Sequence, residues 1–513
     1  MSTLVFPSPR NPRDGERFIL ELDRRLERFD RAILVADWNF QSGRSKVGTA
    51  PWQLKRAAFL SDERLLPWVR SARERSWPYP LTRRLELLER ILLDTQVEQN
   101  PEVIRLRSTL QETVVAFRPR WKKKRAERAV LYKALEESPK EAERRAAYYA
   151  MEPLYRPIEE SLRELVRLRN DRARALGYPS FAEMRLRFEG VSVRRLEELC
   201  DVVADTARPH LRALRDGFRE RTGQSGWHPW DSSFARRHRV PLPARLFPQR
   251  EMFPRIFRAI QQWGFRTDRM RFRVVYHDLP AGGITLAPDP PKDIRILVHR
   301  MGGFLPYCIL FHEVGHAVHS ASIRAPRHLL RWLENIPGVG GCDEGLAGLF
   351  EEIPNTAEWL ETQPGVGVQR AREHAAAARD SNVLDAAWHA SFLRIEQRLY
   401  QNPDRDPMPE AQRFERRLFG YDDYPTLSFA ESFLVESPIY SANYLLAILF
   451  GRQLERSMRE VCGEPYWPNR KVGPWLTRNW FVHGSLYDWV PHVKEVTGRP
   501  FGAEAFRESF AAA

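Results

Sequence analysis

The sequence predicts a mostly α-helical fold that contains one small β-sheet. Long segments place apolar residues three and four positions apart, which is the spacing of an amphipathic helix. The clearest of these segments cover residues 18–38, 81–100 and 126–152. Strand signals are few, and the best are residues 271–279 and 293–299, which flank a loop rich in proline and glycine. No internal repeat and no low-complexity segment indicates a different architecture.

The region between the two halves of the chain is predicted to be ordered. Residues 227–254 are rich in proline and separate a helical first half from a mixed region. Tryptophan and phenylalanine are too frequent there for a disordered tether, so we expect an ordered loop. The whole chain of 513 residues, with 43% hydrophobic and 29% charged residues, has the composition of a large globular protein.

The charge of the protein is strongly basic but evenly spread. The net charge of +14 and the pI near 9.8 would favour an anionic partner. The basic residues are interleaved with acidic ones, and the densest basic run, residues 121–128, lies in a helix-like segment where a solvated face is the simpler interpretation. We therefore expect no nucleic-acid partner.

Cysteine usage and hydropathy indicate a cytoplasmic protein. The four cysteines, Cys200, Cys308, Cys342 and Cys462, are isolated from one another, which predicts neither a disulfide framework nor a thiolate metal site. The N-terminal residues lack the apolar core of a signal peptide, and no apolar segment is long enough to span a bilayer. We expect no membrane partner.

One short segment carries the chemistry. Residues 306–322, PYCILFHEVGHAVHSAS, contain an H-E-x-x-H pattern formed by His312, Glu313 and His316. On a helix, residues four apart lie on one face, so both histidines can direct a ring nitrogen at one metal ion. Glu313 is then placed to act as a general base toward water. The alternative is a buried helix whose two histidines are held by hydrogen bonds.

A catalytic zinc needs a third protein ligand, which has to come from downstream. We favour Glu344, because a Gly-Gly break and Asp343, a plausible cap, predict a new helix that runs to about Ile353, where Pro354 ends it. Glu351 lies two turns further on the same face and is expected to hold a ligand histidine through a hydrogen bond. Glu352 is expected on a solvated helix face. The four acidic candidates are Glu334, Glu344, Glu351 and Glu352.

Residues 292–320 and 341–354 together resemble the zinc peptidases that include thimet oligopeptidase and oligoendopeptidase F, a group related to angiotensin-converting enzyme and the thermostable carboxypeptidases. In that group a glutamate on a second helix is the third ligand, and another glutamate often follows seven residues later. The resemblance thus implies Glu344 as ligand and Glu351 as its companion. Two features depart from the pattern: Glu344 follows His316 by a few residues more than usual, and Gly348 stands where many relatives carry serine or an acid.

The resemblance extends to residues 436–458. Ser437 is expected to cap a helix that has Pro438 in its first turn, and Tyr440 and Tyr444 fall on one face of that helix. Relatives have a similar helix whose tyrosine hydroxyl donates to the oxyanion of the tetrahedral intermediate, which implies this role for Tyr440, with Tyr444 as a second possibility. The alternative is two aromatic side chains packed in a core. Relatives also place a histidine just before this helix, and here no histidine occurs between residues 389 and 483.

The segment upstream of the motif resembles the strand-loop-strand of the converting enzyme, where a histidine touches the bound peptide. The resemblance implies that role for His277, and it implies that the strand at 293–299 is an edge on which an extended substrate pairs its backbone.

Taken over residues 150–513, the resemblance implies a two-lobed helical body with one Zn²⁺ per chain at the floor of a deep central channel. Short peptides would enter this channel and be hydrolysed as by an oligoendopeptidase. The alternatives are a metallocarboxypeptidase of the same group and a catalytically inactive binding protein. Residues 1–150 are expected to form an N-terminal helical region and residues 151–513 the catalytic region of one continuous body.

Overall fold

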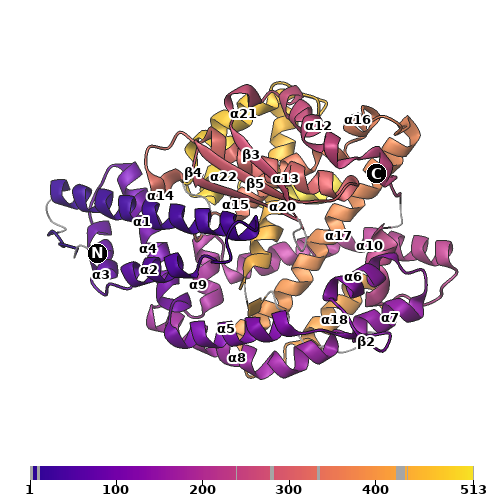
Figure 1. Cartoon of the computed structure of the whole chain (residues 1–513), viewed down its shortest axis with the longest axis horizontal. Coiled ribbons are helices and arrows are strands. Elements are labelled where there is room, and N and C mark those ends of the chain that lie inside the picture. The colour runs from indigo at the N-terminus through magenta and orange to yellow at the C-terminus, as the bar shows by residue number, and fades with distance from the viewer. Residues whose placement is uncertain are drawn as a thin grey trace.

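The computed structural model describes residues 4–8, 12–237, 240–277, 282–331, 336–422, 434–435 and 437–511, without the side chains of residues 115, 129 and 155. Helices make up most of these residues, and the sheets are small (Figure 1). The predicted fold class is therefore confirmed.

The first part of the chain is a series of helices, and the sequence clearly predicts three helices there. Two expected helices lie within α1 and α4, but the one expected at 126–152 is wrong, because Pro139 separates α6 from α7. The basic run at 121–128 is not helical either, since β1 (Arg120–Trp121) and β2 (Lys124–Arg125) form an antiparallel hairpin there. The helices up to residue 237 are α1 (Pro12–Gln41), α2 (Ala50–Leu60), α3 (Leu65–Arg73), α4 (Tyr79–Glu98), α5 (Pro101–Ala116), α6 (Arg128–Glu137), α7 (Glu141–Tyr149), α8 (Glu152–Ala175), α9 (Phe181–Phe188), α10 (Val193–Thr222), η1 (Pro229–Asp231) and α11 (Ser232–Arg237).

The remaining helices surround the sheet and complete the molecule. The ordered loop predicted at 227–254 contains short helical pieces and the start of α12, so it is more regular than expected. Beyond residue 240 the helices are η2 (Ala244–Leu246), α12 (Gln249–Gln262), η3 (Thr267–Arg269), α13 (Phe304–Ser322), α14 (His328–Arg331), α15 (Gly340–Glu351), η4 (Ile353–Asn355), α16 (Ala357–Glu361), α17 (Val368–Gln401), α18 (Met408–Phe419), α20 (Tyr440–Cys462), α21 (Val472–Asn479), η5 (Phe481–His483), α22 (Trp489–Thr497) and α23 (Glu504–Phe510).

The sheet beside the candidate site has three strands, β3 (Phe272–His277), β4 (Gly283–Asp289) and β5 (Asp293–His299), in the order β3-β5-β4. β5 runs parallel to β3 and antiparallel to β4. Strand β4 was missed, because its sequence lies in the segment that proline and glycine marked as a loop. As a consequence β5 is the central strand, and the prediction that it is a free edge is wrong; β4 and β3 are the edges.

Three helices, α13, α15 and α20, form a compact unit next to β4 (Figure 1), with α15 packed against both of the others. The sequence permits this close packing through two glycines. A Cβ at Gly315 would lie 2.8 Å from the Cα of Ala347, and one at Gly345 would lie 2.6 Å from the Phe450 ring. Glycine is needed wherever two backbones approach this closely. The packing fixes the distance between the two helices that carry the candidate ligands.

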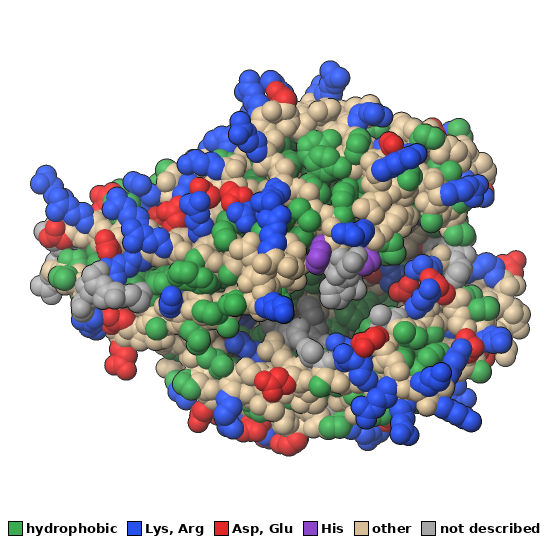
Figure 2. All heavy atoms as spheres, viewed as in Figure 1, with side chains coloured by type: hydrophobic (Ala, Val, Ile, Leu, Met, Phe, Trp, Pro, Cys, Tyr) green, Lys and Arg blue, Asp and Glu red, His purple; other side chains and the backbone are tan. Residues whose placement is uncertain are grey.

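One large hydrophobic core extends from Leu4 to Phe510 and includes residues from most of the helices. The N-terminal helices contact the rest of the chain where α1 packs against β4 and where α5 packs against α8. The division expected near residue 150 stays a prediction. Among the described residues, none of the helices combines the length and the hydrophobicity required to cross a membrane. Lys and Arg side chains are scattered over the face drawn in Figure 2 rather than gathered in one area.

Candidate metal centre

The H-E-x-x-H segment forms the middle of α13, as predicted from its periodicity. Its apolar residues face the core, which leaves His312 and His316 on the opposite side, four residues apart. Their Nε2 atoms lie 3.1 Å from each other. The helix therefore presents two ring nitrogens at a single point.

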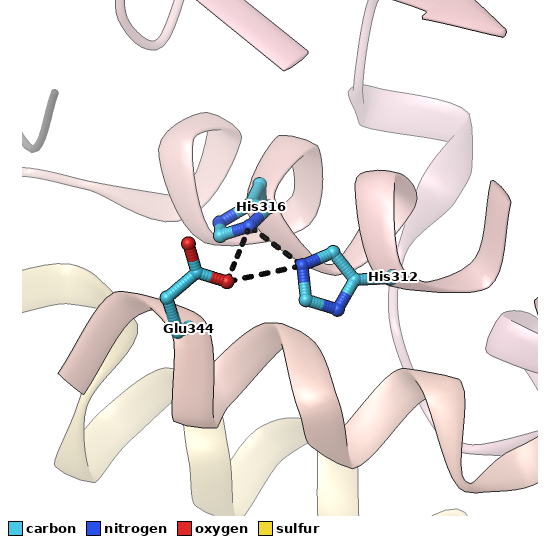
Figure 3. A group of neighbouring side chains, drawn as sticks. All are labelled: His312, His316 and Glu344. Carbon is cyan, nitrogen blue, oxygen red and sulfur yellow. Dashed lines mark hydrogen bonds and ion pairs between the residues drawn. The ribbon is translucent and has the colours of Figure 1, made fainter. Parts of the chain in front are cut away.

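Glu344 of α15 reaches the same point (Figure 3). Its Oε2 lies 3.2 Å from Nε2 of His312 and 3.8 Å from Nε2 of His316. Among the described residues these three side chains form the group of histidine, cysteine and acidic residues that could hold a metal ion. Of the other candidates, Glu334 lies outside the described residues, and Glu352 pairs with Arg452 instead of facing solvent as expected.

A second layer of carboxylates holds the two ring planes. Glu351 Oε2 lies 3.0 Å from Nδ1 of His312, as predicted for this residue. Asp343 Oδ2 lies 3.0 Å from Nδ1 of His316, and its Oδ1 lies 2.9 Å from Nδ1 of His319. The expectation that Asp343 caps the helix is wrong, because α15 begins three residues earlier and the Asp343 carboxylate is engaged by the two histidines. The i, i+3 spacing of His316 and His319 is the sequence signal that could have pointed to a shared acid.

The donor set fits a cation. Each Nδ1 faces a carboxylate, so it carries a proton to donate, and each neutral ring is left with a lone pair on Nε2. The lone pairs on the two Nε2 atoms and the Glu344 oxygen then point at one position, and none of these three atoms carries a proton to donate. Ligand atoms on a tetrahedral zinc lie about 3.3 Å apart for metal distances of about 2.0 Å, and the three distances here are 3.1, 3.2 and 3.8 Å.

The surrounding carboxylates favour protonation of the two histidines. Burial lowers the pKa of His312, but Glu344 and Glu351 outweigh it and raise that pKa well above its usual value. At His316 burial again lowers the pKa, but the Asp343 carboxylate raises it by more. The net result is a pKa of about 9 for His316. A metal ion that binds here therefore has to displace protons from the histidines at neutral pH.

Glu313 lies beside the three candidate metal ligands and is almost completely buried, with 8% of its surface exposed. Thr285 Oγ1 on β4 lies 2.7 Å from Glu313 Oε2 and 2.8 Å from the backbone oxygen of Glu313. Burial raises the pKa of the carboxyl. A Cβ at Gly283 would come within 2.7 Å of Glu313 Cγ, so glycine makes room for this side chain. Sequence reasoning missed both contacts because it missed β4.

Tyr440 contacts the metal group directly, since its hydroxyl donates to Oε1 of Glu344 at 2.8 Å. Tyr440 is the first residue of α20, and the residue at the N-cap is Ile439. The prediction that Ser437 caps the helix and that Pro438 lies in its first turn is therefore wrong; both residues precede the helix in a turn. Burial is the largest cause that raises the pKa of Tyr440 above its usual value, and the Glu344 carboxylate adds to it.

Tyr444 lies one turn further along α20, with its ring 5.2 Å from that of Tyr440. Its other neighbour is His389 of α17, which stacks on it at 5.2 Å. His277, by contrast, ends β3 on the sheet edge away from β4, next to Gly43, and is not among the residues that line the cavity described next.

The metal group lies on the wall of a cavity of about 940 Å³. The first five residues of β4 and the start of α20 form one part of this wall, and side chains from α1, α4, α5 and α9 also line it. On the face drawn in Figure 2, the surface is hollowed between the upper and the lower part of the molecule, and histidine side chains are visible at the edge of the hollow. A volume near the upper end of the usual 300–1,000 Å³ is enough for a short peptide.

The described arginines that line this cavity are all ion-paired. Arg107 pairs with Glu98 at 2.6 Å and Arg185 with Asp94 at 2.5 Å. Arg331 pairs with Glu27 outside the cavity wall at 2.6 Å. Arg107 shares Glu98 with Arg169, so these three side chains together carry one net positive charge.

Comparison with solved structures places this architecture among known folds. A protein assigned as oligoendopeptidase F superposes with a TM-score of 0.70 at 17% sequence identity, covering 98% of this chain and 92% of the other. The chain shares the fold of a peptidase. PZ peptidase A, solved with an inhibitor, gives 0.69 at 16% identity over 98% and 92%. A carboxypeptidase from Pyrococcus furiosus gives 0.67 at 18% identity, with 98% of each chain covered. No protein-family model and no curated protein matches the sequence.

Proposed function

We propose that the protein is a zinc-dependent peptidase that hydrolyses peptide bonds in short peptides, with one zinc ion per chain. The observation that carries this proposal is the convergence of three acceptor atoms, from His312, His316 and Glu344, beside the buried carboxylate of Glu313. Two histidine nitrogens and one carboxylate oxygen are a donor set that suits zinc and leaves a position open for substrate. The fold shared with oligoendopeptidase and carboxypeptidase structures supports the same reaction class.

The proposed roles follow from the positions of the side chains. Bound at this group, zinc would polarise the scissile carbonyl and make the attacking water more acidic. Glu313 takes the proton of that water and later gives it to the leaving amine. Thr285 engages Oε2 of Glu313, which leaves Oε1 for the proton. The raised pKa of Glu313 suits a group that has to both accept and return a proton.

The oxyanion of the tetrahedral intermediate is proposed to receive a hydrogen bond from Tyr440. Burial raises the pKa of its phenol, so the hydroxyl stays a proton donor throughout the working pH range. Its contact with Glu344 keeps it beside the ligands, where the reacting carbonyl has to lie. Tyr444 lines the same cavity and is the second proposed donor.

The substrate is proposed to lie along β4. This strand is a free edge of the sheet, and its residues 283–287 line the cavity, so an extended peptide can add to it through backbone hydrogen bonds. A carboxypeptidase needs a cation for the terminal carboxylate of its substrate. Each described arginine of the cavity pairs with a carboxylate, and Arg107, which shares Glu98 with Arg169, is the one that could receive this terminal carboxylate in a carboxypeptidase.

The test is mass spectrometry of the products from peptides of about five to fifteen residues, a size suited to the cavity, with free and with amidated C-termini. Wild type is compared with Glu313→Gln, which keeps the shape of the side chain but cannot act as a base. We expect internal cuts whichever C-terminal group is present, and a loss of about 10²–10⁴-fold in kcat for the variant at unchanged zinc content.

Other results would redirect the proposal. Stepwise removal of terminal residues from free acids alone would make the protein a carboxypeptidase. Full activity of Glu313→Gln would exclude the proposed mechanism. No cleavage by the zinc-loaded wild type would indicate a binding protein that keeps the peptidase fold.

A further inference from the structure

The backbone that leads into α20 has an unusual conformation directly before Tyr440. Ile439 has a φ of 64° and a ψ of 6°, which is the left-handed region. A β-branched side chain is rarely found there, because its Cβ clashes with the backbone. Such a conformation persists only where the surrounding structure determines it fully, and it often occurs at functional sites. The groups that hold Ile439 are therefore of interest.

Glu396 of α17 holds Ile439 itself. Its Oε1 accepts a hydrogen bond of 2.6 Å from the backbone N–H of Ile439. The side chain of Glu396 is fully buried, and its second oxygen has no hydrogen-bond partner among the described residues. A buried carboxyl group with half of its hydrogen bonds unmade is unfavourable for stability. Its acceptor role toward one backbone amide is the contact that it does make.

Arg169 of α8 contacts residues 434 and 435, which lie further upstream. Its guanidinium is fully buried and donates to the carbonyl oxygens of Leu434 at 3.2 Å and Val435 at 3.1 Å. Its charge faces Glu98, whose Oε1 lies 2.7 Å from Nε of Arg169 and which also pairs with Arg107. The planar fork of an arginine can engage a carboxylate and two carbonyls together, which a lysine cannot. Arg169 thus ties this segment to α4 and α8.

Arg169 thus contacts residues 434 and 435, Glu396 contacts residue 439, and Tyr440 follows directly. A buried ion pair adds little net stability compared with apolar packing, so the network is better explained by the conformation that it specifies. The conformation decides where α20 begins and in which direction its first side chain points. That side chain is Tyr440, whose hydroxyl lies 2.8 Å from Oε1 of Glu344.

We propose that Arg169 and Glu396 are positioning residues for the reaction: they hold Ile439 in the left-handed conformation and thereby set the Tyr440 hydroxyl beside Glu344. Neither residue is placed to touch the substrate. The inference rests on the proposed function, because the role of Tyr440 as oxyanion donor is assigned there.

The experiment is a double-mutant cycle between Glu396 and Tyr440 in the full-length, zinc-loaded protein. Glu396→Leu removes the acceptor, and Glu396→Gln keeps one as the matched control. We expect Glu396→Leu to lower kcat by about 10- to 100-fold with KM and zinc content unchanged, because a displacement near 1 Å costs about that much. The control is expected to stay within about threefold of wild type. In a Tyr440→Phe background Glu396→Leu should have no further effect on kcat.

A structural role alone gives a different pattern. Equal losses of kcat in the presence and absence of the Tyr440 hydroxyl, or equal losses for the leucine and glutamine variants, would overturn the proposal. Arg169→Lys keeps the charge but loses donors to the two carbonyls, and it is expected to reproduce both the loss and its dependence on Tyr440. This variant decides the question if Glu396→Leu does not fold.

Amide hydrogen exchange provides a readout that does not require activity. Loss of the Glu396 acceptor should accelerate exchange at residues 439–443, with α13 and α15 unchanged. Unchanged exchange in this segment would overturn the proposal that Glu396 holds Ile439, even in a protein with peptidase activity. A zinc-loaded wild type that cleaves no peptide would contradict the proposed function instead, and the exchange data would still decide whether Glu396 holds Ile439.

Discussion

Replacing Gly315 with alanine tests whether the spacing between α13 and α15 sets the geometry of the metal group. The added Cβ would lie 2.8 Å from Cα and 3.1 Å from the backbone oxygen of Ala347. Carbon atoms in contact prefer about 3.5–4.0 Å, so the two helices have to move apart by about 0.7 Å or more. The neighbouring atoms belong to backbone, which cannot turn away as a flexible side chain would.

This displacement is larger than a metal site tolerates. Ligand distances have to hold within about 0.2 Å, and two ligands come from α13 while Glu344 comes from α15. We therefore expect Gly315→Ala to bind zinc at least about tenfold more weakly than wild type, the scale seen when ligand orientation is disturbed. Titration of the metal-free protein against a chromophoric chelator measures this affinity.

Stability should change as well, and a second variant isolates the cause. Gly348→Ala lies in the same helix pair, but its Cβ would have no atom within 4 Å. Both substitutions gain up to about 1 kcal/mol of helix propensity, and only Gly315→Ala incurs overpacking of about 1–3 kcal/mol. Denaturant unfolding of the two metal-free variants should differ by that amount. Equal stability together with wild-type zinc affinity in Gly315→Ala would refute the argument from helix spacing.

Three further predictions concern the neighbours of the metal group. Gly283→Ala should lower kcat about tenfold or more at unchanged zinc content, because the added Cβ would displace the Glu313 side chain. Steady-state kinetics together with metal analysis checks this prediction. A loss of zinc in the variant would contradict it. Asp343→Asn should weaken zinc binding about 10- to 100-fold, since it removes the charge that orients His316. Equilibrium dialysis against buffered zinc measures this affinity. Wild-type affinity in the variant would show that Asp343 does not orient His316. Zinc binding at pH 7 should release protons, because the pKa of His316 is raised to about 9 and that of His312 is raised well above its usual value. Below that pH the affinity for zinc should rise about tenfold for each unit of increasing pH and for each displaced proton. Calorimetry in buffers of different ionisation enthalpy measures the proton release. No release would mean that the histidines are already unprotonated.

Much of the helical framework could be predicted from the sequence. The amphipathic period of α1 and α4 is a local property, because each helix buries one stripe of its own side chains. The prediction failed where local signals conflicted. Pro139 divides a segment that otherwise has helical periodicity. The glycines and prolines around β4 predict a loop, but pairing with β5 supplies the hydrogen bonds that make this segment a strand.

The metal group was predicted to different extents in its two layers. His312, Glu313 and His316 could be placed together because a helix brings residues four apart to one face. Glu344 could be ranked above its neighbours by its expected helix and by the resemblance to the zinc peptidases, and the helix begins earlier than expected. The contact between Asp343 and His316 joins two helices, so the i, i+3 spacing of His316 and His319 could suggest a shared acid but could not identify the residue that supplies it.

The sequence by itself determined the helical class of the fold and the pair of histidines with the glutamate between them. Both depend on periodicity along a single helix, which is set by backbone geometry and the burial of one face. Only the tertiary structure decided the distance of Glu344 from the histidines, the contact of Thr285 with Glu313, and the left-handed turn at Ile439 that places Tyr440. These depend on contacts between residues far apart in the chain, and packing of whole helices fixes them to within an ångström.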